Sequence, residues 1–272
     1  MAGTQSLWLG AVLLVGCGFE AAPLEEDMEP VPPGTIDPSI ERKCATSDNS
    51  LRLCIDFEDT ATLAGDGSGR GHHPVIADAL ITMDRATELA VQMSTQSRLQ
   101  IQENADLDIT TNLTISMWAD NDGLPQSGAS FWMLDNNKQY SMSLQADGRL
   151  RCGLGSSTVD SATALNLFGG GWHQVACTYD GNQLKVFVDG WVAGCSVVGR
   201  PIATTGTEGL AIGANIGAGT TAPLFTSRFV GGLDNVQVFA RTWSDRELCD
   251  AAGDDWCTSG CGGGGGGEGG EE

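Results

Sequence analysis

The sequence predicts an all-β fold of antiparallel strands with one short C-terminal helix, and three observations support this class. Segments such as 113–117 and 140–144 alternate apolar and polar residues, which is the pattern of strands that bury one face. Asp-Gly pairs at 147–148, 180–181 and 189–190 lie beside such runs, and this dipeptide favours the tight turns of β-hairpins. Three hairpin turns in a stretch of about 50 residues exclude an alternating α/β fold.

The expected elements follow in a simple order along the chain. An alternating strand comes first, hairpins follow, and a helix closes the folded region. Ser244 can cap that helix, and Glu247 three residues later completes a capping box. The elements occupy 113–117, 140–144, 150–154, 175–179, 184–188, 191–192 and 244–248.

The composition is that of a folded but strongly acidic protein. Hydrophobic residues make up 41% of the 272 residues, which is enough for a core. The formal net charge is −21, and residues 44–261 carry 25 acidic and 12 basic side chains. This charge repels phosphate backbones and anionic membrane surfaces, so we expect no nucleic-acid partner. It is compatible with cation binding.

Nine cysteines indicate an oxidising compartment. None has the CxxC spacing, and three histidines are few for zinc sites, so disulfides are the expected use of these residues. Short spacings favour the local pairs Cys44–Cys54 and Cys249–Cys257, and the partners of the other candidates stay open. The eight disulfide candidates are Cys44, Cys54, Cys152, Cys177, Cys195, Cys249, Cys257 and Cys261.

The N-terminus resembles a bacterial lipoprotein signal. Residues 7–15 form an apolar run of signal-peptide length, too short to span a bilayer. The run ends in Leu14-Val15-Gly16-Cys17, which resembles the lipobox, although residues 1–6 lack the usual Lys or Arg. The resemblance implies a cleaved signal peptide at 1–16 and acylation of Cys17. The alternative is a buried strand that begins the fold.

This resemblance predicts an exported protein that meets the membrane only through its lipid. Residue 18 is glycine rather than the Asp that retains some lipoproteins at the inner membrane, so we expect the outer membrane or the cell surface. The acidic, Pro-rich residues 17–43 are typical of a semi-extended tether. They are followed by a folded domain at 44–261 and a Gly/Glu-rich disordered tail at 262–272.

The region around the second and third Asp-Gly turns carries a family resemblance. Residues 171–181 (GWHQVACTYDG) and 184–190 (LKVFVDG) resemble the core motif of laminin-G-like, or concanavalin A-like lectin/glucanase, jelly rolls. Flanking segments agree in the family's order over nearly all of 51–250. They are 112–118, 231–239 with 243–248, and 53–58 with 66–69. The resemblance implies a two-sheet jelly-roll sandwich, a fold that hosts lectins, hydrolases, lyases and adhesion modules.

From these resemblances we expect a non-catalytic surface module that binds a carbohydrate or an extracellular protein. Glycosidases on this fold use a strand with alternating carboxylates, roughly E-x-D-x-E. The nearest matches here are the pairs Asp56/Glu58 and Asp106/Asp108. His173 occupies the family's structural WH position, so no catalytic residue is predicted. Two alternatives remain: a structural envelope lipoprotein without a discrete ligand, and a hydrolase or lyase that acts on polysaccharide.

Exposed aromatic side chains are the best candidates for ligand contact, because their faces can stack on sugar rings. Trp191 follows an Asp-Gly turn where the family carries small or aliphatic residues, and Trp132 lies in a loop-rich stretch. Both are ligand-binding candidates, and the alternative for each is a tryptophan that covers the rim of the sandwich. Trp118, Trp172 and Trp243 match positions that the family packs inside.

Calcium is the one cofactor that the sequence suggests. Several families on this fold bind it through loop carboxylates and carbonyls. The alternative is that Asp, with Asn and Gly, simply forms the turns. The candidate ligands are Asp66, Asp120, Asp122 and Asp135.

Overall fold

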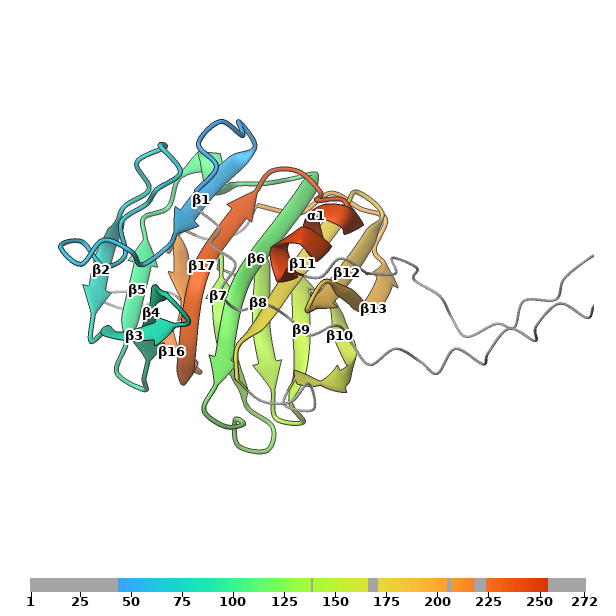
Figure 1. Ribbon diagram of the computed structural model, residues 1–272. Coiled ribbons are helices and arrows are strands. Elements are labelled where there is room, and N and C mark those ends of the chain that lie inside the picture. Colours follow the sequence, from blue (N-terminus) through green and yellow to red (C-terminus); the bar gives the residue numbers. More distant parts are fainter. Residues whose placement is uncertain (1–43, 138, 166–170, 205–206, 218–223, 254–272) are drawn as a thin grey trace, which may run out of the picture. The chain divides into compact units, whose positions relative to one another are not determined.

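Two antiparallel sheets packed face to face make up the fold (Figure 1), and this confirms the predicted sandwich. The computed structural model describes residues 44–137, 139–165, 171–204, 207–217 and 224–253. All of these residues lie in a unit that covers 34–272.

Sheet A has eight described strands. Seven of them pair one after another, and the eighth, β1, pairs with β17. Its strands, in spatial order, are β13 (Trp191–Val197), β12 (Gln183–Val188), β11 (His173–Asp180), β6 (Asn112–Asn121), β17 (Gly231–Phe239), β4 (Glu88–Met93) and β3 (Ile81–Arg85), with β1 (Leu51–Ile55).

Sheet B has seven described strands and faces sheet A. In spatial order they are β10 (Ser157–Ala164), β9 (Arg149–Leu154), β8 (Tyr140–Gln145), β7 (Ser130–Asp135), β14 (Leu210–Ile212), β5 (Arg98–Ile101) and β2 (Pro74–Asp78). A short ribbon of β15 (Asn215–Gly217) and β16 (Leu224–Thr226) and a 3-10 turn, η1 (Ala105–Leu107), complete the elements.

The core lies between the sheets because alternate residues of each strand point inward. In β6, Leu113, Ile115 and Met117 are buried against sheet B, whereas Ser116 and Trp118 belong to the opposite, outer face of sheet A. Each fully buried side chain of the Leu or Ile kind contributes about 1.5–3 kcal/mol relative to its exposed state. The alternation of apolar and polar residues therefore determines which side chains point to the outer faces of the two sheets.

All three predicted hairpins are confirmed. The Asp147-Gly148 turn joins β8 to β9, the Asp180-Gly181 turn joins β11 to β12, and the Asp189-Gly190 turn joins β12 to β13. Gly190 has a φ of 79°, and the preceding Asp189 is also left-handed at 53°. Positive φ at both central positions is what the tight hairpin turn requires.

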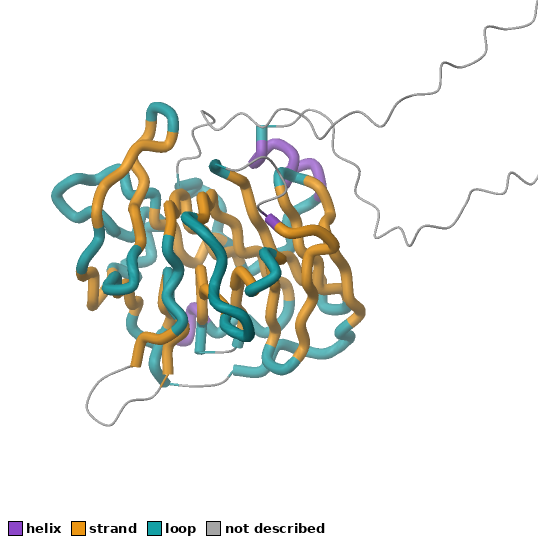
Figure 2. The backbone as a smooth tube through the Cα atoms, turned by 90° about the horizontal axis from the view of Figure 1, so that it is seen from below, coloured by secondary structure: helices purple, strands orange, loops and turns teal. Residues whose placement is uncertain are grey.

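The predicted helix is confirmed as α1 (Asp245–Ala252), with Ser244 as its N-cap and Glu247 completing the capping box. It lies over β11 and β12 on the outer face of sheet A (Figures 1 and 2). Leu248 and Ala251 pack there against Phe187 and Trp243. This second apolar cluster covers one part of that face.

Four cysteines form two disulfides within the described residues. Cys44 bonds to Cys54 as predicted, and Cys152 of β9 bonds to Cys177 of β11, which links sheet B covalently to sheet A. Cys195 and Cys249 are disulfide-bonded as well. The remaining candidates, Cys257 and Cys261, lie outside the described residues, and so does the predicted pairing of Cys249 with Cys257.

Several predicted segments fall on residues that the structure does not describe. They are the signal peptide 1–16, Cys17 with the tether 17–43, and the tail 262–272. In the part of the chain that is described, no helix is long and apolar enough to cross a bilayer.

Candidate functional site

A row of four side chains crosses the outer face of sheet B. Strand pairing places Trp132 opposite Ser143, Ser143 opposite Arg151, and Arg151 opposite Asp160. The row therefore runs over β7, β8, β9 and β10 in turn. The inward neighbours of these residues, such as Met142 and Cys152, pack in the core. The two-residue period of the strands thus places these polar side chains together on the outer face, with one aromatic ring at the end of the row. Ser143, in the middle of the row, is itself only 2% exposed.

This strip is hollowed. Two depressions of about 210 and 360 Å³ share Ser130, Gln145 and Arg151 in their walls, so they form one continuous groove. We call it the sheet B groove. Its lining includes Ser130, Trp132, Ser141, Ser143, Gln145, Asp147, Arg151, Gly153, Thr158 and Asp160.

Neutral side chains form the floor of the groove and bind one another. Ser130 Oγ donates to Gln145 Oε1 at 3.0 Å, and Gln145 Nε2 donates to Ser143 Oγ at 2.8 Å. A Cβ at Gly153 would lie 2.6 Å from Ser141 Oγ, so a larger residue there would displace this serine from the floor. The floor offers hydroxyl and amide groups that can both donate and accept hydrogen bonds.

Arg151 and Asp160 form a bidentate ion pair at the β10 end of the row. Arg151 Nε donates to Asp160 Oδ1 at 2.6 Å, and Nη2 donates to Oδ2 at 2.7 Å. Hydrogen bonding to Asp160 raises the pKa of the Arg151 guanidinium above its usual range. The pair remains partly accessible to solvent, so its unused N–H groups and carboxylate lone pairs can meet a ligand.

Trp132 closes the other end of the row. Its backbone N–H donates to Ser227 O at 2.9 Å, which fixes β7 against the segment before β17. The side chain is half-buried and lines the groove. An aromatic face beside hydroxyl and amide groups is an arrangement that can hold a molecule with apolar C–H faces and many hydroxyls.

The second aromatic candidate is not part of this site. Trp191 is half-buried at the start of β13, the edge strand of sheet A, and pairs with Val188. The structure therefore places the two ligand-binding candidates on different sheets. Trp132 lines the groove, whereas Trp191 lines none of the described hollows.

The tryptophans expected in the interior fall into two groups. Trp118 and Trp243 are buried as predicted, at 2% and 5% exposure. The prediction for Trp172 was wrong, because this side chain is only half-buried. It precedes β11 and lies over Gly232 on the outer face of sheet A, where an added Cβ would come within 2.5 Å of the indole ring. Because Gly232 has no side chain, the indole ring can lie directly on the strand. The glycine covers one side of the ring and leaves the ring only half-buried.

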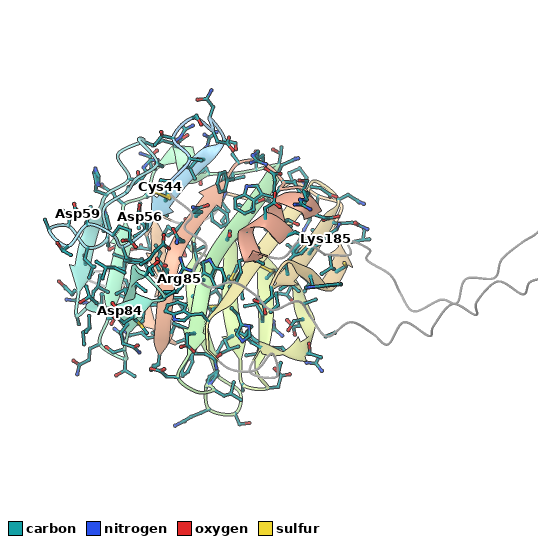
Figure 3. All side chains as sticks on the ribbon, viewed as in Figure 1. Cys44, Asp56, Asp59, Asp84, Arg85 and Lys185 are labelled. Carbon is teal, nitrogen blue, oxygen red and sulfur yellow. A yellow bond between two sulfur atoms is a disulfide. The ribbon has the colours of Figure 1, made fainter. Side chains whose placement is uncertain are left out.

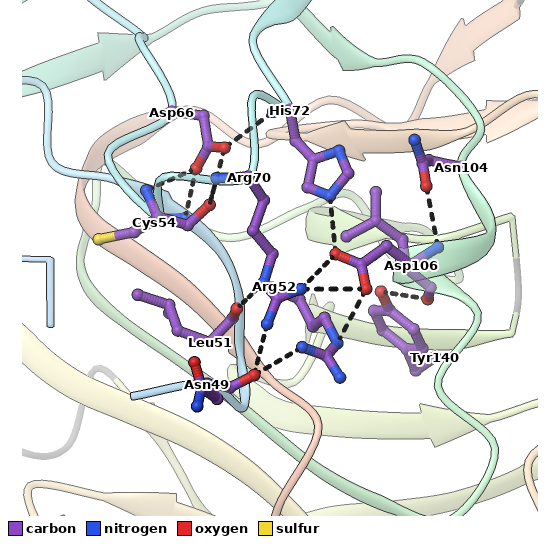
Figure 4. Close-up of polar contacts among 12 residues, drawn as sticks. Asn49, Leu51, Arg52, Cys54, Asp66, Arg70, His72, Asn104, Asp106 and Tyr140 are labelled. Atoms are coloured by element: carbon purple, nitrogen blue, oxygen red, sulfur yellow. Dashed lines mark hydrogen bonds and ion pairs between the residues drawn. The ribbon is translucent and has the colours of Figure 1, made fainter. Parts of the chain in front are cut away.

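Asp66, a candidate calcium ligand, organises its own loop (Figure 4). Its Oδ1 accepts from the backbone N–H groups of Cys54 at 3.1 Å and Ser68 at 2.9 Å. Its Oδ2 accepts from Ser68 Oγ and from the backbone N–H of His72, both at 2.8 Å. Four donors already surround this carboxylate.

The other candidate calcium ligands lie apart from Asp66. Asp135 is fully buried, and its Oδ2 accepts from Asn215 Nδ2 at 3.1 Å and from the backbone N–H of Ile216 at 3.0 Å. Asp120 is the penultimate residue of β6, and Asp122 directly follows the strand. Burial, and then the nearby Asp122 carboxylate, raises the pKa of Asp120, although His173 opposes this.

Asp122 is exposed and accepts from Gln92 Nε2 at 2.6 Å. Among the described residues, no three His, Cys, Asp or Glu side chains are grouped so that they could hold a metal ion. Calcium binding stays a prediction.

The acidic pairs considered for catalysis are held in other contacts. Glu58 Oε1 accepts from the backbone N–H of Leu89 at 2.9 Å. Asp106 meets Arg70 Nη1 at 3.1 Å and His72 Nε2 at 3.2 Å, as Figure 4 shows. Cys177 is oxidised in its disulfide, as expected, so it offers no thiol nucleophile. Neither acidic pair lines the sheet B groove.

A larger hollow of about 630 Å³ lies beside β2. Small or apolar side chains dominate its walls, which come from 61–65, 73–74, 77 and 79–80. His73 is the one histidine among these wall residues, and its Nδ1 atom accepts a hydrogen bond from the backbone N–H of Asp66 at 3.1 Å. These walls present few groups that could bind a polar ligand, so the sheet B groove remains the stronger candidate.

Sequence reasoning missed most of the groove. A signal was present in the hairpin around Asp147-Gly148, because the polar positions of 140–144 and 150–154 must share its outer face. That rule would have found Ser143 opposite Arg151. It would not have found Asp160, whose strand is not marked by an Asp-Gly turn.

Comparison with known families gives a match over the greater part of the chain. A family model described as the concanavalin A-like lectin/glucanases superfamily matches residues 93–249. No curated protein matches the sequence.

Solved structures resemble the fold at low sequence identity. The binding domain of Paraclostridial Mosquitocidal Protein 1 has a TM-score of 0.60 at 13% identity, with 74% of this chain and 51% of that chain covered. Domain 4 of AbnA, a GH43 extracellular arabinanase from Geobacillus stearothermophilus solved with arabinotriose, has a TM-score of 0.55 at 16% identity, with 75% and 98% covered.

The binding domain of botulinum neurotoxin DC, solved in complex with SialylT, has a TM-score of 0.56 at 12% identity, with 75% of this chain and 51% of that chain covered. The chain thus spans about half the length of the toxin binding domains it matches, at 51% for each of the two described. At such identities these likenesses concern the fold alone.

Proposed function

We propose that this chain, which belongs to the concanavalin A-like lectin/glucanases superfamily, is a non-catalytic module that binds carbohydrate in the sheet B groove. The observation that carries the proposal is the row from Trp132 to Asp160, in which an indole ring lies at the end of a series of hydroxyl and charged groups. The amide of Gln145 lines the same groove. A sugar ring offers C–H faces that stack on an indole and hydroxyls that bind polar side chains at its edge.

The proposal is supported by two of the similar structures. The arabinanase domain was solved with arabinotriose and a toxin binding domain with SialylT, so domains of this fold bind saccharides in other proteins. A non-catalytic role is supported by the acids of the groove. Asp160 is held by Arg151, and Asp147 is exposed at the rim beside Arg149. Glycoside hydrolysis uses a pair of carboxyl groups that flank the bond to be cleaved.

The test is an array of linear and branched saccharides probed with the purified full chain and with two tryptophan variants. Trp132→Ala should weaken binding of each positive saccharide at least about tenfold, as expected for a central aromatic contact. Trp191→Ala is the matched control, because both tryptophans are half-buried on strands, and it should bind like the wild type. If Trp191→Ala abolishes binding and Trp132→Ala does not, the groove is not the site. If no saccharide binds, the proposed function is wrong.

We also propose that the module is held at the cell envelope, at the outer membrane or cell surface, by a lipid on Cys17. The support is the apolar run 7–15, which leads into Leu14-Val15-Gly16-Cys17. Metabolic labelling with a radioactive fatty acid and membrane fractionation test it. Cys17→Ser should lose the label and leave the membrane fraction. An unchanged label and unchanged partitioning in the variant would rule out this anchor.

A further inference from the structure

The charges of the sheet B groove point to the class of saccharide that it takes, an inference that rests on the proposed function. Among the described residues of its lining, one is basic, Arg151, and two are acidic, Asp147 and Asp160. Asp160 holds the guanidinium through two hydrogen bonds of 2.6 and 2.7 Å. The groove therefore presents a cation whose charge is cancelled by Asp160 and, at its rim, a second carboxylate, Asp147, which lies 3.5 Å from Arg149 Nε.

A sugar that carries a carboxylate or sulfate should bind weakly beside the Arg151–Asp160 pair. The anionic group would compete with Asp160 for Arg151, and it would lie close to the negative charge of the Asp160 carboxylate. Breaking the bidentate pair to serve a ligand would leave Asp160 without its partner. A hydroxyl has no such conflict, because it can accept from the unused N–H groups of Arg151 and donate to Asp160 at the same time.

The rest of the groove also suits hydroxyls. Ser143 and Gln145 belong to a chain of neutral hydrogen bonds that includes no charged group. From Trp132 to Asp160 the row crosses three strand intervals, about 14 Å at the usual spacing, a length that covers roughly three sugar rings. The domain as a whole is acidic, which further disfavours anionic chains.

We infer that the sheet B groove selects a neutral saccharide chain of about three rings, and that the Arg151–Asp160 pair is the specificity-determining element that excludes acidic saccharides. The pair presents its donors and acceptors to hydroxyls as a neutral unit. Asp160 thus acts by cancelling the charge of Arg151, in addition to any contact of its own with a ligand.

The experiment measures the affinity of the full chain for two groups of oligosaccharide probes by calorimetry. The neutral probes are arabino-, xylo-, manno- and gluco-oligosaccharides, and the acidic probes are oligogalacturonate and a sialylated oligosaccharide. Methyl-esterified oligogalacturonate is the matched neutral form of the acidic chain. The wild type should bind its best neutral probe at least about tenfold more tightly than any acidic probe, a ratio that one charge-assisted hydrogen bond can set.

Two variants separate charge from shape. Asp160→Asn frees the cation while keeping the side-chain size, so the ratio of acidic to neutral affinity should rise about tenfold. The double variant Arg151→Gln with Asp160→Asn removes both charges and should return the ratio towards the wild-type value. A merely structural role would weaken both classes together and leave the ratio unchanged.

The outcomes are distinct. Equal or tighter binding of acidic probes by the wild type overturns this inference and leaves carbohydrate binding intact. An unchanged ratio in a folded Asp160→Asn protein overturns the role of the pair. Loss of all saccharide binding by the wild type overturns the proposed function, and this inference with it.

Discussion

Arg85 and Asp234 form an ion pair inside the protein, with Arg85 Nε 2.5 Å from Asp234 Oδ2 and both side chains at 0% exposure. The guanidinium also binds Glu88, and its Cζ atom lies 4.8 Å from the centre of the Trp118 ring. Figure 3 labels Arg85 near the middle of the ribbon. The four residues come from β3, β4, β17 and β6, so the cluster ties the edge of sheet A to its centre.

Loss of the Arg85 side chain should therefore destabilise the fold severely. Arg85→Ala leaves the Asp234 carboxylate buried without its partner, and breaking a buried ion pair in this way costs about 3–5 kcal/mol. Urea unfolding measures the effect. Arg98→Ala is the control, because the Arg98–Asp78 ion pair is exposed on both sides and should contribute about 0–1 kcal/mol. Similar losses in the two variants would contradict the buried role of Arg85.

The same pair should make stability depend on pH. Burial, opposed by Arg85, raises the pKa of Asp234 from its ordinary 3.8 to about 7. A carboxyl with a raised pKa in the folded state takes up its proton more readily when folded. Its contribution to stability is thus complete below about pH 4 and is lost as the pH rises to about 7.

Thermal unfolding between pH 4.5 and 7.5, in roughly half-unit steps, measures this loss. Asp234→Asn cannot titrate, so its melting temperature should change less over this interval than that of the wild type. The slopes are compared rather than the absolute values, because the variant also weakens the contact with Arg85. Parallel slopes would show that other groups cause the dependence.

Trp118 and Trp172, which both lie on the outer face of sheet A, should differ in how much they stabilise the fold. Trp118 is 2% exposed and lies against Arg85, so Trp118→Ala should cost about 3–5 kcal/mol. Trp172 is half-buried over Gly232, and Trp172→Ala should cost clearly less. Chemical unfolding of both variants checks the order. An equal or larger loss for Trp172→Ala would show that Trp172 is part of the core after all.

Replacement of both cysteines of the Cys152–Cys177 disulfide by alanine should lower the free energy of unfolding by about 2–4 kcal/mol. The sequence separation is 25 residues, against 10 for Cys44–Cys54. If the restraint acts on the unfolded chain, the shorter loop should contribute about 0.8 kcal/mol less. Unfolding of the two double variants under oxidising conditions measures both values. A larger loss for the Cys44–Cys54 variant would contradict the loop-length argument.

The fold could be predicted because its signals are local. Each Asp-Gly turn fixes two neighbouring strands, and Ser244 with Glu247 fixes the start of α1 within one helical turn. Cys44 and Cys54 are close in sequence, so their pairing could be proposed as well. In each case the residues that interact are separated by a few positions in the chain.

The site could be predicted only in part because it depends on contacts between distant segments. Trp132 was chosen as an aromatic in a loop-rich stretch, and it proves to lie on β7 with Asp160 three strands away. The register of β7 and β10 has no Asp-Gly signal. Arg85 and Asp234 are 149 positions apart, and no periodicity relates them. The error for Trp172 has the same origin, since its exposure depends on what covers Gly232.

The bond between Cys152 and Cys177 also bears on how the protein responds to tension. The groove belongs to sheet B, whereas β1 and β17, the first and last described strands, belong to sheet A. Apolar contacts between sheets have no preferred direction, so they resist shear weakly. When a ligand in the groove is pulled while the ends of the chain are held, the Cys152–Cys177 bond can carry the force directly from β9 to β11. Cys152 is the neighbour of Arg151 in the chain. Oxidation of the two cysteines would therefore raise the force at which the two sheets slide apart.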